Sequence, residues 1–221
     1  DPVSDRYLIV FEDYRTGDGN IYGIFVSGQG DLITIPSSEA DGSFPICDVE
    51  GGIYAPSVSF NYREGRYLVV WGDYRTSQNW GLQDIYGQLL DHEGNLLVVG
   101  SGKALRKTQS LEGFPVAAVE DVHESVPDVS YDVTTNEWFV AFGTACAELS
   151  AVKGQRVNHE GVCLTQDGKT GQTPMLVSEN THICPDGDQA RVQFNNESHG
   201  GFGKSGSAGR PECLVIWNTY A

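Results

Sequence analysis

Residues 67–97 read YLVVWGDYRTSQNWGLQDIYGQLLDHEGNLL. The stretch begins with a nearly continuous apolar run, crosses a polar loop, and continues in an alternating segment that ends at the turn HEGN before a further apolar piece. Short apolar runs and apolar–polar alternation are both typical of β-strands, and a Gly-containing turn between them is typical of a hairpin. This stretch therefore predicts consecutive strands joined by turns.

The same unit recurs along the chain, which is the observation that decides the fold. Its strand–loop–strand pattern returns at residues 6–26, 137–157 and, for the first strand only, 212–221. The segment before it also recurs, as FPICDVEGGIYAPSVSFN, FPVAAVEDVHESVPDVSYD and, more loosely, TPMLVSENTHICPDGDQARVQFN. We expect one domain, 1–221, made of repeat units at approximately 1–43, 44–113, 114–172 and 173–221.

Each complete unit supplies four strands, for which PSVSF, YLVVW, DIYGQLL and FPVAAV are the examples. Four-stranded units repeated along a chain are typical of the blades of a β-propeller. A β-sandwich also uses short strands and turns, but it does not require repeats of similar sequence. The predicted fold is all-β: a β-propeller, or a propeller segment, of about three to four antiparallel blades.

The repeats carry the pattern W-x-D-x-R followed by D-I-Y-G-Q, which the second unit matches best. In this pattern the chain resembles bacterial and archaeal secreted or surface β-propeller proteins, over nearly its whole length. The resemblance implies a secreted or cell-surface location.

Both ends of the sequence fall inside a repeat unit, so we expect incomplete blades at both termini. DPVSDRYLIV leads into a second strand, and CLVIWNTYA ends with one. Unpaired strand edges are templates for pairing with other strands. We expect these edges to pair either with the remainder of a longer chain or with a protein partner.

Acidic side chains outnumber basic ones by 30 to 14, which gives a formal net charge of −16. This charge repels a phosphate backbone, so no nucleic-acid partner is expected. No apolar run approaches the roughly 18 residues of a membrane-spanning helix, so we expect no membrane span. The acidity is typical of solubility in an extracellular or salty medium, with calcium binding as the alternative. We predict an extracellular protein with no cofactor and no metal site.

Three polar residues of the second unit flank one loop: Asp73, Arg75 and Asp84. The first unit carries the equivalents Asp13, Arg15 and Asn20. The third unit replaces all of them, with Thr144, Cys146 and Ala151. An arginine fork can bridge acceptors across a loop, and joint loss is what a mutually dependent cluster would show. We interpret the set as a structural staple, with ligand contact as the alternative.

Five cysteines occur without any C-x-x-C pair, so zinc and haem c sites are not expected. Cys146 replaces the staple arginine, and Cys184 lies in a loop expected at the same face. We predict a Cys146–Cys184 disulfide and, more weakly, a Cys163–Cys213 disulfide, which leaves Cys47 unpaired.

The sequence favours a non-catalytic structural or protein-interaction module, and therefore no enzyme. The recurring acids stand beside arginines, and Asp128 is the only acid in the three expected inner strands PSVSF, PDVSY and ARVQF. The first alternative is a carbohydrate-binding propeller, in which exposed aromatics such as Tyr74 and Trp80 stack on sugar rings. The further alternative is a glycoside hydrolase, whose reaction requires paired carboxylates.

Overall fold

A computed structural model of the chain describes residues 1–75, 81–100, 105–146, 149–180, 190–194 and 213–217. Every regular element within these ranges is a β-strand, and every strand pair is antiparallel. The predicted all-β class with antiparallel sheets is therefore confirmed. No helix long and apolar enough to cross a membrane occurs in the described part of the chain.

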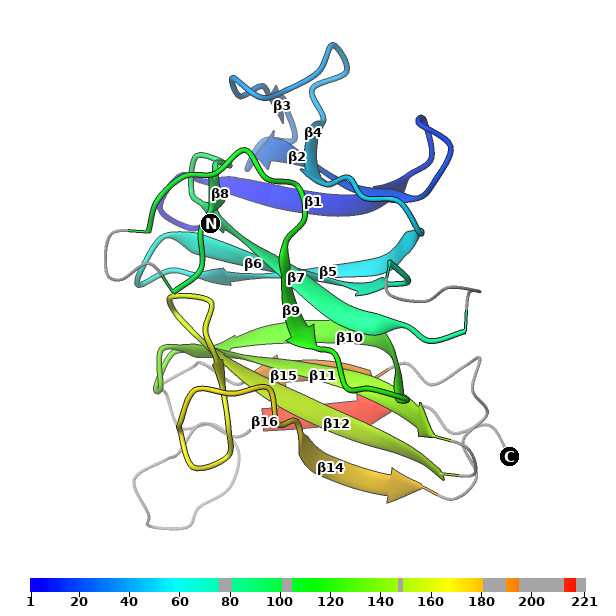
Figure 1. Cartoon of the computed structure of the whole chain (residues 1–221). Helices are drawn as coiled ribbons and strands as arrows, with labels where there is room; N and C mark the ends of the chain where they lie inside the picture. The colour runs from blue at the N-terminus through cyan, green and yellow to red at the C-terminus, as the bar shows by residue number, and fades with distance from the viewer. Residues whose placement is uncertain (76–80, 101–104, 147–148, 181–189, 195–212, 218–221) are drawn as a thin grey trace.

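The strands form four sheets that follow one another in chain order (Figure 1). The first sheet contains β1 (Arg6–Asp13), β2 (Asn20–Ser27), β3 (Leu32–Ile33) and β4 (Phe44–Cys47). The second contains β5 (Ile53–Asn61), β6 (Arg66–Asp73), β7 (Asp84–Asp91), β8 (Leu96–Leu97) and β9 (Phe114–Ala117). The third contains β10 (His123–Asp132), β11 (Glu137–Cys146), β12 (Leu149–Asn158), β13 (Cys163–Leu164) and β14 (Met175–Asn180). The fourth contains β15 (Ala190–Phe194) and β16 (Cys213–Trp217).

The outermost strand of each of the first three sheets is divided in two. Strand β7, for example, pairs with the short strand β8 near one end and with β9 near the other. The same division occurs at β2, which pairs with β3 and β4, and at β12, which pairs with β13 and β14. The sequence predicted one outer strand per unit, because a two-residue strand is too short to show a period.

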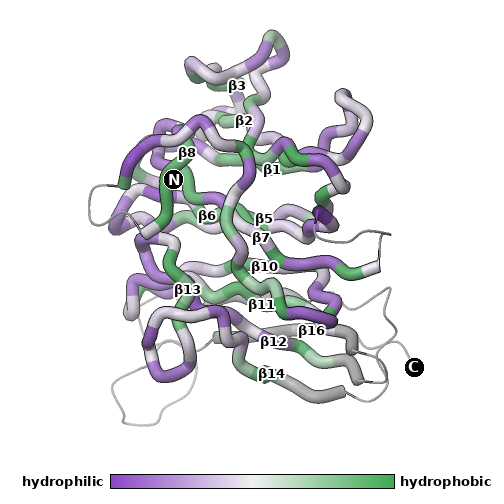
Figure 2. The backbone as a smooth tube through the Cα atoms, viewed as in Figure 1, coloured by the Kyte–Doolittle hydropathy of each residue, from purple (hydrophilic) through white to green (hydrophobic). Residues whose placement is uncertain are grey.

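The sheets stack through their inner edge strands. Strand β5 packs against β1 on one side and β10 on the other, and β10 in turn packs against β15. In the hydropathy view, the apolar positions gather along the strands and the hydrophilic positions gather on the connecting loops (Figure 2). Burial between successive sheets therefore holds the sheets together.

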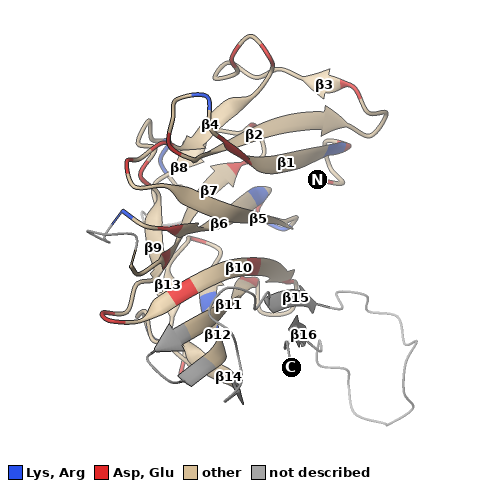
Figure 3. Cartoon of the chain, turned by 90° about the vertical axis from the view of Figure 1, so that its right-hand side faces the viewer, with Lys and Arg blue, Asp and Glu red and all other residues tan. Residues whose placement is uncertain are grey.

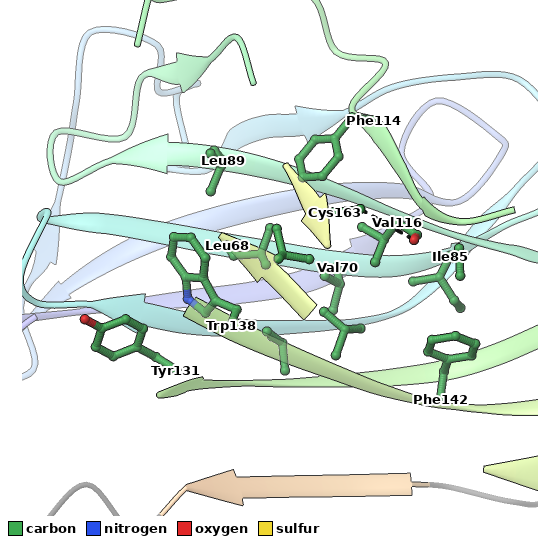
Figure 4. Packing of buried hydrophobic residues seen from close by; sticks show 14 of the residues in the cluster. Leu68, Val70, Ile85, Leu89, Phe114, Val116, Tyr131, Trp138, Phe142 and Cys163 are labelled. Carbon is green, nitrogen blue, oxygen red and sulfur yellow. Dashed lines mark hydrogen bonds between the residues drawn. The ribbon is translucent and has the colours of Figure 1, made fainter. Parts of the chain in front are cut away.

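Strand β6 shows why its sequence is apolar at consecutive positions. Tyr67, Val69 and Trp71 belong to the apolar cluster shared with the first sheet, whereas Leu68 and Val70 belong to the cluster shared with the third. All five are at most 2% exposed. A strand buried on both faces loses the alternation seen in a half-exposed strand. Figure 4 shows the second of these clusters, in which the side chains of two sheets interdigitate.

Candidate functional site

One end of the stacked sheets carries the loops that join β1 to β2, β4 to β5, β6 to β7 and β9 to β10. We call this end the loop face and define it by residues 14–19, 48–52, 74–75, 81–83 and 118–122. It lies on the right in Figure 1 and faces the viewer in Figure 3. Loops carried by a rigid sheet scaffold are common positions for binding and catalytic residues.

The first repeat brings its predicted arginine and aspartate together. Arg15 donates from Nε to Asp13 Oδ1 at 2.9 Å and from Nη2 to Asp13 Oδ2 at 2.6 Å. The same guanidinium donates to Glu39 at 2.6 Å and to Asp41 at 3.0 Å, and it lies 4.5 Å from the centre of the Tyr22 ring. The arginine therefore joins the loop to the segment before β4.

The second repeat contains a more deeply buried version of this contact. Arg75 Nε donates to Asp73 Oδ2 at 2.9 Å, and its Nη1 donates to the Glu112 carbonyl oxygen at 2.6 Å. Its guanidinium lies 4.0 Å from the centre of the Tyr86 ring. Asp73 is fully buried and also accepts from Trp71 Nε1 at 3.0 Å. The arginine thus ties β6 to the segment that precedes β9.

The third member of each predicted staple points elsewhere. Asn20 donates from Nδ2 to Thr16 Oγ1 at 2.7 Å, within its own loop. Asp84 lies opposite Asp73 in the β6–β7 register, but its carboxyl is a neighbour of Glu124 on the third sheet. The sequence interpretation missed the tyrosines that stack on each arginine. Their recurrence in I-Y-G of both units was the pattern that could have revealed them.

A row of rings crosses the loop face from the first sheet to the third. Tyr54 and Tyr74 make an edge-to-face contact with centroids 5.7 Å apart, and Tyr74 lies 6.4 Å from His123. Tyr14 stands at the other end and is 53% exposed, and the nearby Tyr54 makes a small contribution to the raised pKa of Tyr14. Tyr74 was predicted from the sequence, whereas Trp80 lies outside the described residues. Tyr74 and Tyr54 are partly buried, whereas Tyr14 is exposed, and each ring offers an apolar surface with a polar tip, which suits contact with sugars.

Two carboxylates reach the inner strand β5 from the sheets on either side of it. Glu12 on β1 accepts from the Ala55 backbone N–H at 2.7 Å, and Tyr14 Oη donates to its other oxygen at 2.7 Å. This second bond raises the pKa of Tyr14 to about 12. Asp128 on β10 accepts from Ser57 Oγ at 2.7 Å. Both carboxylates are partly exposed, and their partners on β5 are two residues apart.

Register shifts in the inner strands β5 and β10 position Ser57 and Asp128. The registers of β5 and β10 shift between Tyr54 and Ser57 and between Ser125 and Asp128. Within the shifts, Ala55 and Val126 have φ values of 53° and 48°. A positive φ at a non-glycine residue is uncommon, and for a β-branched residue it is strained. Bulges next to functional sites re-aim side chains, and here they precede Ser57 and Asp128 directly.

Glu124, at the start of β10, is a buried acid that the sequence analysis did not identify. It is 0% exposed, and its carboxyl lies beside that of Asp84. Burial raises the pKa of Glu124 to about 8, and the Asp84 carboxyl adds to this rise, whereas Lys153 opposes it. Glu124 therefore holds a proton at neutral pH, which it can share with Asp84.

Two cysteines have described side chains, and neither forms a disulfide. Cys47 and Cys163 are free and buried, and burial raises the pKa of both thiols, that of Cys163 to about 12. The weaker predicted pairing of Cys163 with Cys213 therefore finds no support. The favoured pairing cannot be placed, because Cys184 lies outside the described residues. Among the residues with described positions, no group of three or more His, Cys, Asp and Glu side chains is arranged to hold a metal ion.

No protein-family model matches the sequence, and no curated protein matches it. Among solved structures, an N-acetylgalactosamine deacetylase from F. plautii, in complex with blood group B trisaccharide, aligns with a TM-score of 0.52 and 11% identity. The alignment covers 98% of this chain and 60% of the deacetylase chain, so this chain spans less than two thirds of that protein. The similarity shows a shared fold.

Two further structures come from Bacillus licheniformis. A GH43 endo-arabinanase aligns over 96% of this chain and 90% of its own, with 11% identity and a TM-score of 0.31. The glycoside hydrolase family 43 YxiA protein aligns over 96% and 52%, with 14% identity and a TM-score of 0.35. These TM-scores are too low to support an argument about the fold.

The predictions of a non-catalytic interaction module and of no enzymatic activity are contradicted, because the solved structure that shares this fold is that of an enzyme, the N-acetylgalactosamine deacetylase. The physical reason for the error lies in the repeats. The sequence interpretation weighed the acids that recur, such as Asp13 and Asp73, and these bind arginines. The acids at the inner strands, Glu12 and Asp128, do not recur, and Gly72 occupies the place of Glu12 in the second unit.

Proposed function

We propose that this chain acts in the hydrolysis of glycans, with the sugar bound across the loop face and the reacting bond beside β5. The observation that carries the proposal is the convergence of Glu12 and Asp128 on two nearby residues of β5, at the end of the aromatic row. Glycoside hydrolysis needs two carboxyl groups that flank the scissile bond. The fold shared with a carbohydrate-processing enzyme supports this proposal by analogy.

In this reaction one carboxylic acid protonates the leaving oxygen as the glycosidic bond breaks. The other carboxylate either removes a proton from an attacking water or forms a glycosyl intermediate that water then hydrolyses. Hydrogen bonds from the Ala55 amide and the Tyr14 hydroxyl fix the orientation of the Glu12 carboxylate. Such preorganisation keeps the carboxylate in place without reorganisation during the reaction.

We also propose that the four sheets are blades of a β-propeller. The inner strands β5, β10 and β15 adjoin one another, and each sheet extends away from this row. This is how blades are arranged around a propeller axis, where the inner strands carry functional residues. An extracellular or cell-surface location, where glycans are abundant, stays a prediction from the sequence.

The test is a screen of the purified chain against a panel of plant, microbial and animal polysaccharides, with reducing ends measured after incubation. Glu12→Gln and Asp128→Asn are the test variants, because each keeps the shape and an acceptor oxygen. Asp31→Asn is the control, since this exposed acid lies in the turn between β2 and β3, at the opposite end of the sheet. Sugar release by the wild type and the control alone supports the proposal. Equal release by all four proteins, or by none, contradicts it.

A further inference from the structure

The loop face combines the aromatic row with a marked excess of negative charge. From this combination we infer that it accepts glycans without acidic groups and excludes uronates and sulfated or sialylated sugars. The inference rests on the proposed glycan site, and it adds the chemical class of the substrate.

The exposed acids occur on three described loops. They are Asp18 between β1 and β2, Asp48 and Glu50 between β4 and β5, and Glu120 and Asp121 between β9 and β10. Figure 3 views this end of the molecule and shows acidic positions on several of its loops. These loops contain or directly precede Tyr14, Tyr54 and His123 of the aromatic row, so a glycan bound on the row would lie near their carboxylates.

The basic groups of the described loop face are already neutralised. Arg15 is bound to three carboxylates, those of Asp13, Glu39 and Asp41. Arg75 is bound to the buried Asp73 and covered by the Tyr86 ring. Neither guanidinium offers an anionic sugar a charge that is not already compensated.

The carboxylates of Glu12 and Asp128 add to the negative electrostatic potential of the loop face. Glu12 and Asp128 lie where the reacting sugar is proposed to bind, and the groups that donate hydrogen bonds to them include the neutral Tyr14, Ala55 and Ser57. A site lined by one sign of charge raises the local concentration of ligands of the opposite sign and lowers that of the same sign. Exposed acids on the loops beside a binding site weaken the binding of an acidic sugar by about tenfold at low ionic strength.

The experiment compares glycan pairs that differ only in charge. Suitable pairs are oligogalacturonate and its methyl ester, sialylated and desialylated oligosaccharides, and sulfated and desulfated galactans. They are presented on an array and bound at low and at high ionic strength. We expect binding to be confined to the neutral members at low ionic strength, and the difference to shrink as salt is added.

A charge variant gives the inference an independent test. Glu120→Gln combined with Asp121→Asn removes two exposed charges next to His123, and asparagine tolerates the φ of 60° at position 121. This variant should bind acidic glycans about threefold better, with neutral glycans unchanged, and Asp31→Asn should change neither.

The outcomes separate the inference from the proposal beneath it. Acidic glycans that bind as well as their neutral partners, or better, overturn the inference and leave the glycan site intact. A wild-type protein that binds no glycan on the array removes the proposed function and the inference with it. Selective binding of neutral glycans supports both.

Discussion

The hydroxyl of Ser57 on β5 donates a 2.7 Å hydrogen bond to Asp128 on β10, so the inner strands of two successive sheets are joined at the level of their bulges. Ser57 Oγ also accepts from the Val129 backbone N–H at 3.4 Å. These bonds fix the Asp128 carboxylate relative to the strand that also binds Glu12. Ser57 in the second repeat occupies the position that Asp128 occupies in the third. The same repeat position therefore supplies a structural hydroxyl in one sheet and a carboxylate in the next.

Replacing Asp128 should separate these two roles. Asp128→Asn keeps an oxygen that can accept from Ser57, so the melting temperature should change little. The rate of glycan hydrolysis should fall by about a hundredfold or more, because the group can no longer exchange a proton. Steady-state rates and a thermal melt of the same preparation measure both effects. A variant with normal activity would show that Asp128 is a structural residue.

Ser57→Ala is the matched change on the other side of this bond. It removes the donor and leaves the carboxylate, so stability should fall by about 1 kcal/mol, as for a typical hydrogen bond. Activity should fall less than in Asp128→Asn. An equal loss in both variants would mean that the bond, rather than the carboxylate, is what the reaction needs.

The Arg75 contact should contribute more to stability than the similar contact at Arg15. Arg75→Ala leaves the fully buried Asp73 without its ionic partner, and we expect the free energy of unfolding to fall by about 1 to 3 kcal/mol. Arg15→Ala affects a more exposed arginine, with a side chain 31% exposed against 19% for Arg75, and its effect should be smaller. Urea denaturation of both variants tests the order. A larger loss at Arg15 would contradict it.

The sequence predicted these ion pairs because their residues recur at fixed positions in two repeats. Recurrence reveals contacts that more than one repeat uses for stability, such as the arginine–aspartate pairs of the first two repeats and the apolar run in β6. It cannot reveal chemistry confined to one repeat. Glu12 and Asp128 meet at β5, and Glu124 meets Asp84, only through the stacking of different sheets. The sequence spacing of such residues carries no period.

The aromatic row should bind the glycan by stacking. Tyr54→Ala and Tyr74→Ala should each weaken binding by about threefold to tenfold, the range expected for loss of one ring contact. Tyr62→Ala is the control, since Tyr62 is 42% exposed, packs edge-to-face on Tyr131 and lies in the turn between β5 and β6, away from the loop face. Calorimetric titration with a glycan identified in the screen measures the affinities. If only Tyr62→Ala weakened glycan binding, the sugar would bind at the end of the sheets opposite the loop face.

The buried Glu124 should make stability depend on pH. Its pKa of about 8 in the folded protein lies above the value near 4.3 of an unfolded glutamate. Between these values the folded state holds a proton that the unfolded state has lost. Glu124 therefore makes its full contribution to the free energy of unfolding below about pH 4. This contribution declines as the pH rises toward 8 and changes little above that. The slope attributable to one such group is at most about 1.4 kcal/mol per pH unit.

Glu124→Gln isolates this effect from the other acids. Glutamine has the same shape and is neutral at every pH, so it should remove the decline between pH 5 and pH 8 that the wild type shows. Melting temperatures of both proteins, measured across that range, give the comparison. The variant should equal the wild type near pH 5 and exceed it near pH 8, because only the wild type must then bury a second negative charge beside Asp84. Two parallel curves would mean that Lys153 keeps Glu124 ionised throughout this range. Glu124 would then form an ion pair with Lys153 instead of sharing a proton with Asp84.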